Sequence, residues 1–339
     1  MARRIGKTVI LDSKPRIIAN AAAVGKKEGE GPLSKEFDVV FDDTTLGQDC
    51  WEKSESELLK RTVELAISKA ALRTNEIDAI FSGDLLNQCI GSTFGLRDMS
   101  IPFCGIYGAC STMALSLIQA STAIESGGYN TCIAATGSHF CSAEKQFRFP
   151  LEYGGQRTPT AQWTVTGAGA AVLQKSDSPL SPYIDKVHLG TIQDYGIIDS
   201  TNMGAAMAPA ARKTISDFLR DTNTVPEDYD LILTGDLGSV GSELLIQLLN
   251  REDGIDISSR HNDCGLLIFD RENQDVHAGG SGCGCSASVL NSFILNSMRN
   301  GKYSNILFVA TGALMSPVSS REGESIPGIA HLVNIRTGE

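Results

Sequence analysis

Apolar runs that end in a glycine turn recur along the chain, and this pattern is typical of buried strands in a parallel sheet. The run over residues 76–85 (EIDAIFSGDL) is matched by residues 228–237 (DYDLILTGDL). Each run follows a segment with helical spacing of apolar positions, around residues 57–72 and 206–220. The match predicts that the chain contains two copies of one helix–strand unit.

A second pair of matching units supports this prediction. Tyr107–Thr112 opens a helix without charged residues that runs to about residue 124, and Gly280–Ser286 opens another that runs to about residue 298. Each helix is followed by a glycine turn, by a strand that ends in Ala-Thr-Gly and later by a closing strand. The expected strands are residues 131–137 and 167–172 in the first copy and 305–312 and 328–333 in the second.

Helices without a charged face must be buried on all sides. One such helix in each half predicts a layer of helices between two sheets. The sequence therefore indicates an α/β fold made of two similar halves, residues 1–178 and 179–339, with no long linker between them.

Composition and charge exclude several classes of protein. Hydrophobic residues make up 42% of the 339 residues, which is ordinary for a soluble globular chain. The net charge of −11 repels nucleic acid and anionic lipid, so we expect no nucleic-acid partner. The nine cysteines are an odd number and several lie in apolar stretches, which favours a reduced, cytoplasmic protein. The basic residues 1–7 are not followed by a long apolar run, so we expect no signal peptide.

Cys110 is the strongest candidate for chemistry. It lies with Ser111 at the turn before the first uncharged helix, where unpaired N–H groups and the helix dipole lower a thiol pKa from about 8.5. This position suits a nucleophile for acyl transfer. The alternative is that Cys110 is only a small residue chosen for tight packing, and the local sequence does not decide between the two.

His139 is the candidate base for Cys110, because it directly follows the strand that ends at Ser138. A surface or hydrogen-bonded structural histidine is the alternative. The other histidines are interpreted as surface or core residues, and no histidine has metal-ligand spacing with the cysteines. We therefore expect no metal site made from side chains.

Two further segments could hold an anion. Gly279–Gly282 precedes the second uncharged helix, which begins with Cys283 and Cys285, and backbone N–H groups at such a start can bind an anion. The same glycines could instead serve only close helix packing. The loop over residues 138–165 carries Lys145, Arg148 and Arg157, which are candidates for holding a carboxylate or are simply solvated.

The chain resembles the thiolase-like condensing enzymes in three features. These are the repeated order of helices and strands, Gly108-Ala-Cys110 at a helix start, and Thr166-Gly-Ala-Gly-Ala170 before a strand. More specifically, the chain resembles the stage V sporulation protein AD family. Three stretches carry this resemblance: 138–150 with QFRFP at 146–150, 154–167 (GGQRTPTAQWTVTG), and 310–317 (ATGALMSP) with 326–331 (IPGIAH). The resemblance implies a five-layered αβαβα fold, usually as a homodimer.

Departures from the condensing enzymes bear on catalysis. Those enzymes pair the cysteine with His-Asn or His-His. At the corresponding places this chain has Thr234–Gly238 (TGDLG) and Gly282–Ser286 (GCGCS), so both polar partners are missing. A carboxylate such as that of Asp236 near a thiol raises the thiol pKa. We therefore expect Cys110 to be a vestigial nucleophile and the protein not to be an enzyme.

The resemblance implies binding of dipicolinic acid (pyridine-2,6-dicarboxylate) during its uptake into the developing spore. It implies a soluble subunit, peripheral on the spore inner membrane, that works with membrane-embedded stage V sporulation proteins. Each ligand carboxylate is expected to face one helix start, with calcium as a possible companion of the ligand and no other cofactor. The expected binding residues are Cys110, Ser111, His139, Arg148, Arg157, Asp236, Gly282, Cys283 and Cys285. A Cys110-dependent acyltransferase or thioesterase, and a purely structural subunit, remain as alternatives.

Overall fold

The fold is seen in a computed structural model that describes residues 2–147, 156–176, 178 and 181–338. Its strands follow the order β12-β11-β14-β15-β10-β3-β9-β7-β5-β6, and β10 and β3 meet at the single pair Tyr183–Arg16. This narrow junction separates two five-stranded sheets with the same order and directions. In each sheet two antiparallel pairings are followed by two parallel pairings.

The strands of the two sheets correspond one to one. The first sheet contains β3 (Arg16–Gly25), β9 (Gly167–Gln174), β7 (Thr131–Ser138), β5 (Ala79–Gly83) and β6 (Phe103–Gly105). The second contains β10 (Tyr183–His188), β15 (Gly328–Arg336), β14 (Asn305–Ala313), β11 (Leu231–Thr234) and β12 (His261–Asp263). The short strands β1 (Arg3–Ile5), β2 (Thr8–Ile10) and β4 (Val39–Phe41) extend this system, and β8 (Trp163–Thr164) pairs with β13 (Gly280–Ser281).

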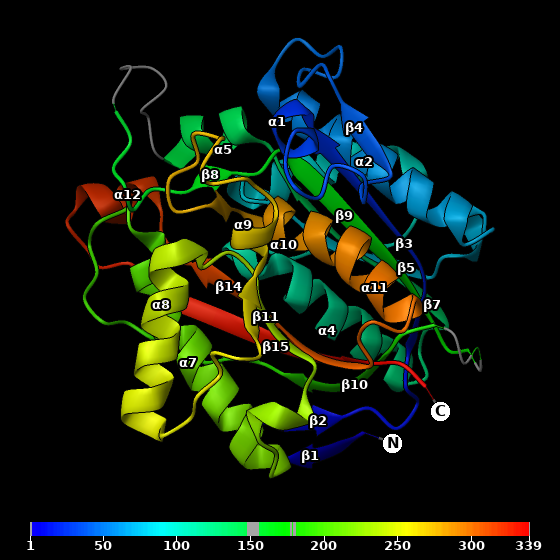
Figure 1. Ribbon diagram of the computed structural model, residues 1–339. Helices are drawn as coiled ribbons and strands as arrows, with labels where there is room; N and C mark the ends of the chain where they lie inside the picture. The colour runs from blue at the N-terminus through cyan, green and yellow to red at the C-terminus, as the bar shows by residue number, and fades with distance from the viewer. Residues whose placement is uncertain (1, 148–155, 177, 179–180, 339) are drawn as a thin grey trace.

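Helices form three layers around the sheets, as Figure 1 shows. α2 (Trp51–Lys69) packs on the outer face of the first sheet, and α7 (Met203–Thr222) packs on the outer face of the second. Between the sheets lie α4 (Thr112–Glu125) and a continuous helix that contains α10 (Cys283–Val289) and α11 (Leu295–Arg299). The remaining helices are α1 (Lys26–Gly29), α3 (Ile90–Leu96), α5 (Phe140–Phe147), α8 (Gly238–Leu248), α9 (Cys264–Leu267) and α12 (Pro317–Arg321).

The central helices are buried because their sequences offer no polar face for solvent. Met113 and Leu117 of α4 and Val289 and Leu295 of the second helix are fully buried in one core that also takes side chains from both sheets. Burial of such side chains contributes about 1.5–3 kcal/mol each. The predicted αβαβα fold and its internal duplication are therefore confirmed.

The boundary between the halves at residues 178 and 179 stays a prediction, because residues 177 and 179–180 lie outside the described residues. The first residues of the chain do not stay with the first sheet, since β2 pairs with β10 of the second. In the described part of the chain, no helix combines the length and the apolar character that a membrane span needs.

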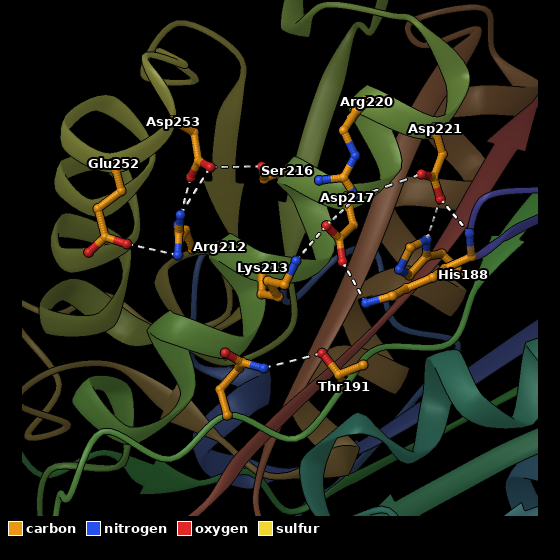
Figure 2. Close-up of polar contacts among 12 residues, drawn as sticks. His188, Thr191, Arg212, Lys213, Ser216, Asp217, Arg220, Asp221, Glu252 and Asp253 are labelled. Atoms are coloured by element: carbon orange, nitrogen blue, oxygen red, sulfur yellow. Dashed lines mark hydrogen bonds and ion pairs between the residues drawn. The ribbon is translucent and has the colours of Figure 1, made fainter.

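Strands β1 and β2 pair as an N-terminal hairpin, and a polar network connects this hairpin to α7 (Figure 2). The Asp217 carboxylate, which is 1% exposed, forms ion pairs with Lys7, Lys213 and Arg220. Its neighbour Asp221 accepts hydrogen bonds from the backbone N–H groups of Lys7 and Thr8. The cations hold the pKa of Asp217 well below its usual range against the opposing effect of burial. The network therefore holds α7 against the N-terminal residues that pair with β10 of the second sheet.

Candidate functional site

Cys110 lies in a helical turn, Ala109–Ser111, that leads directly into α4. Ala109 has the left-handed backbone conformation (φ 51°), an uncommon one for a residue with a side chain. The turn packs closely on the end of β14, where a Cβ at Gly312 would lie only 2.8 Å from the Gly108 carbonyl oxygen. The backbone of both halves thus fixes the position of the buried Cys110 thiol.

A pocket of about 240 Å³ lies over Cys110. Its wall is mostly apolar and also presents hydroxyl groups from Tyr107, Thr164, Ser281, Ser316 and Ser319. Among the described residues of the wall, none carries a charged side chain. The other lining residues are Leu85, Ala109, Ala143, Phe147, Met203, Ala313, Leu314 and Met315.

Asp236 lies beneath this pocket and is completely buried. Its carboxyl group accepts hydrogen bonds from the Thr311 hydroxyl (2.8 Å) and the Gly282 backbone N–H (2.9 Å), and it lies close enough to the Cys110 thiol for its charge to act on the thiol. Burial raises the pKa of Asp236 to about 6. Burial, and then the Asp236 charge, raise the pKa of the Cys110 thiol well above its usual value. The direction agrees with the sequence-based expectation that Asp236 raises this pKa, and the lowering that a helix start alone would give is not seen.

The start of α10 is occupied by groups of the protein itself. The Asp236 carboxylate accepts a hydrogen bond from the Gly282 N–H, and the Ser138 hydroxyl oxygen accepts one from the Gly284 N–H at 3.1 Å. The Cys283 thiol donates to the Gly137 carbonyl oxygen at 3.0 Å. An external carboxylate would have to displace these internal acceptors. The Cys110 start lines the pocket with Ala109 and Cys110, whereas the start of α10 contributes only Ser281, the residue before its N-cap Gly282, to the described part of the wall.

Two other expected binding residues point away from the pocket. The Ser111 hydroxyl donates to the Gly108 carbonyl oxygen at 2.6 Å. Cys285 is buried in the central core, where burial raises its thiol pKa well above the usual value. Neither residue lines the wall of the pocket.

His139 is engaged elsewhere. Its Nε2 lies 2.9 Å from the Thr44 carbonyl oxygen, its Nδ1 accepts from the Cys141 backbone N–H, and its ring stacks on Trp51. Burial lowers the pKa of His139. Because both ring nitrogens already have partners and His139 does not line the pocket, the structure does not bring it to Cys110 as a base.

The structure tests the predicted binding role of one of the two arginines in the 138–165 loop. Arg148 lies outside the described residues. Arg157 does not line the pocket and instead packs over the Trp163 ring, with its Nη2 3.1 Å from an Asp275 carboxylate oxygen. The described part of the loop contributes Thr164 and Phe147 to the pocket in place of a charge.

Sequence reasoning missed Thr311, which holds Asp236, and the methionines Met203 and Met315 of the wall. The repeated Ala-Thr-Gly at the ends of β7 and β14 was the available signal for Thr311. Its counterpart Thr136 donates to the Gly83 carbonyl oxygen in the first half. No pattern in the sequence indicated that the two methionines line the pocket, because they come from segments distant in sequence.

Comparison with known proteins places the chain in a family. A model of the family "Stage V sporulation protein AD (SpoVAD)" matches residues 6–336. Stage V sporulation protein AD of Bacillus subtilis (strain 168) is 44% identical over 327 residues, covering 96% of both chains. Among solved structures, OleA from Xanthomonas campestris (TM-score 0.61, 13% identity, 96% of this chain and 99% of that one) has a similar fold. So does 3-oxoacyl-[acyl-carrier-protein] synthase III from Aquifex aeolicus (TM-score 0.56, 14% identity, 95% and 99%).

Proposed function

Because this chain belongs to the stage V sporulation protein AD family, we propose that it binds dipicolinic acid without catalysis and that the ligand occupies the Cys110 pocket. The proposal rests on one observation above all: a buried carboxyl group, that of Asp236, lies next to the buried Cys110 thiol, and its charge raises the pKa of that thiol. A nucleophilic thiol needs a neighbour that stabilises the thiolate, whereas a carboxylate opposes it. This arrangement favours a binding site over an acyl-transfer site.

The size and chemistry of the pocket suit a planar ring with polar substituents. An apolar cavity of roughly 150 Å³ is enough for benzene, and this pocket measures about 240 Å³. Tyr107 and Phe147 offer aromatic surface to a ring, and a hydroxyl such as that of Ser316 can donate to a carboxylate. The ligand carboxylates would be held by hydroxyl groups and by the helix start at Cys110, without Arg157.

Titration calorimetry with dipicolinate, with and without calcium, tests this proposal. We expect saturable binding of one ligand per chain, weakened about two- to tenfold in Tyr107→Ala by the loss of aromatic contact. Tyr129→Ala is the matched control, since Tyr129 is also exposed but does not line the pocket. Absence of heat in both conditions would overturn direct binding. Acylation of Cys110 by an acyl thioester, seen by intact mass, would favour the transferase alternative instead.

The proposal extends to the setting of the protein. We infer that it acts on the inner membrane of the developing spore with membrane-embedded stage V sporulation proteins, as a homodimer. Strand β6 supports the dimer, because it ends the first sheet and its residues Phe103–Gly105 are exposed. Ile90, Phe94 and Phe103 form an exposed apolar flank there, each at least 40% exposed. Such an edge can pair with its own copy across a two-fold axis.

A further inference from the structure

Trp163, the first residue of β8, takes part in an aromatic stack. Strand β8 and helix α1 lie at the same end of the molecule in Figure 1. The Phe140 ring stacks on one face of the indole, with centroids 3.8 Å apart and planes 11° apart. This face is therefore closed to other groups, and anything else over the ring must lie on the opposite face.

Two cations share that opposite face. The Lys27 ammonium lies 4.1 Å from the Trp163 ring centroid, and the Arg157 guanidinium lies 4.6 Å from it. Like charges held this close repel each other, and burial followed by the Arg157 charge lowers the pKa of Lys27. The indole attracts each cation but carries no net charge to balance them.

Neighbouring carboxylates balance the positive charge of Lys27 and Arg157 only in part. Asp275 pairs with Arg157 at 3.1 Å, but its side chain is 77% exposed and it also pairs with His277 at 2.9 Å. Across residues 2–147, 156–176 and 181–338, no carboxylate forms an ion pair with Lys27, and the charges of Asp275, Glu28 and Glu30 only partly offset the lowering of its pKa. The second terminal nitrogen of Arg157, Nη1, is buried and has no hydrogen-bond partner among the described residues. A buried donor without a partner is costly, and an ordered water or ion is a usual explanation.

We propose that Lys27 and Arg157 form a binding site for a small oxyanion, a carboxylate or a phosphate, separate from the Cys110 pocket. The anion would accept from Arg157 Nη1 and from the Lys27 ammonium, and it would balance the two cations that share Trp163. Neither cation lines the Cys110 pocket, so the two sites can be tested independently.

The indole itself reports on this site. The chain has two tryptophans, so Trp51→Phe leaves Trp163 as the only one. We would titrate this variant with inorganic phosphate and, separately, with malonate at constant ionic strength in chloride. A saturable change in Trp163 fluorescence is expected with at least one of them, and the arm that responds identifies the anion class. Adding Lys27→Gln or Arg157→Gln should weaken the response at least tenfold, whereas the nearby exposed Arg271→Gln should leave it unchanged.

A second measurement takes its main result from the unaltered chain. Equilibrium dialysis of the unaltered chain with radiolabelled phosphate or malonate should give about one bound anion per chain, and Tyr107→Ala should leave this number unchanged. No saturable binding of either anion, or equal binding by Lys27→Gln and the unaltered chain, would overturn the proposal.

Discussion

The thiol of Cys110 and the carboxyl group of Asp236 form a buried pair in which only one member is readily ionised. Burial disfavours charge on both, and a negative charge on Asp236 disfavours a thiolate further. The hydrogen bonds from Thr311 and Gly282 favour the charged form of Asp236 and so oppose the thiolate. Two residues thus account for the proposed loss of catalysis in a fold shared with enzymes.

Asp236→Asn should make Cys110 more reactive, because it removes the neighbouring negative charge while keeping the size of the side chain. Each unit of pKa lowering increases the thiolate fraction about tenfold, so we expect at least a roughly tenfold faster alkylation by iodoacetamide near pH 8. Peptide mass spectrometry measures the rate at Cys110, with the exposed Cys104 as the internal control. An unchanged rate ratio between the two cysteines would show that Asp236 does not suppress the thiol.

Binding of dipicolinate should depend on pH through the same carboxyl group. Because the pKa of Asp236 is raised to about 6, the group loses its charge as the pH falls from 7.5 to 5.5. Ligand carboxyls, with ordinary values near 4, stay charged over this range. We expect roughly fivefold tighter binding at pH 5.5 than at 7.5, by calorimetry, and a flat profile in Asp236→Asn. Tighter binding at the higher pH would contradict this arrangement.

Helix α7 is coupled to the N-terminal hairpin through charges rather than through apolar contact alone. Lys7 is brought to Asp217 by the pairing of β2 with β10, and Lys213 and Arg220 reach the same carboxylate from within α7. Three cations around one buried carboxylate leave a net positive group if that carboxylate is lost. Its removal therefore costs more than the loss of one surface ion pair.

Asp217→Asn should lower the free energy of unfolding by about 3 kcal/mol near pH 7, measured by urea unfolding. Since the folded-state pKa of Asp217 is lowered, its contribution is present above the unfolded value near 4 and is lost as the pH falls below it. The difference between the two proteins should therefore shrink in acid. Asp256→Asn is the matched surface control and should change stability by less than about 0.5 kcal/mol.

At the scale of the whole molecule, one end of the sheet system is exposed. At the β6 end the strand and the side chains of Ile90 and Phe94 are exposed, and the proposed homodimer would bury them. If so, Phe94→Glu should give a mass of 36.1 kDa by light scattering where the unaltered chain gives twice that value. Val225→Glu, at another exposed apolar position, should leave the dimer intact. A monomeric unaltered chain would refute the dimer.

The sequence by itself determined the fold of this protein. Local patterns carry that information: the runs 76–85 and 228–237 became β5 and β11, and the uncharged segments after Cys110 and Gly282 became the central helices. A helix without a polar face can only be buried, and a duplicated pattern can only build two similar sheets. The same patterns, with the motifs of residues 154–167, identified the family.

Only the tertiary structure decided which side chains meet in the site. His139 turns to Thr44, and Arg157 joins Lys27 on Trp163. These partners are more than 90 residues apart in sequence, as with His139 and Thr44 (95). Hydrogen bonds and ion pairs depend on distances of a few ångströms, which the packing of sheets and helices sets and no local spacing in the sequence encodes.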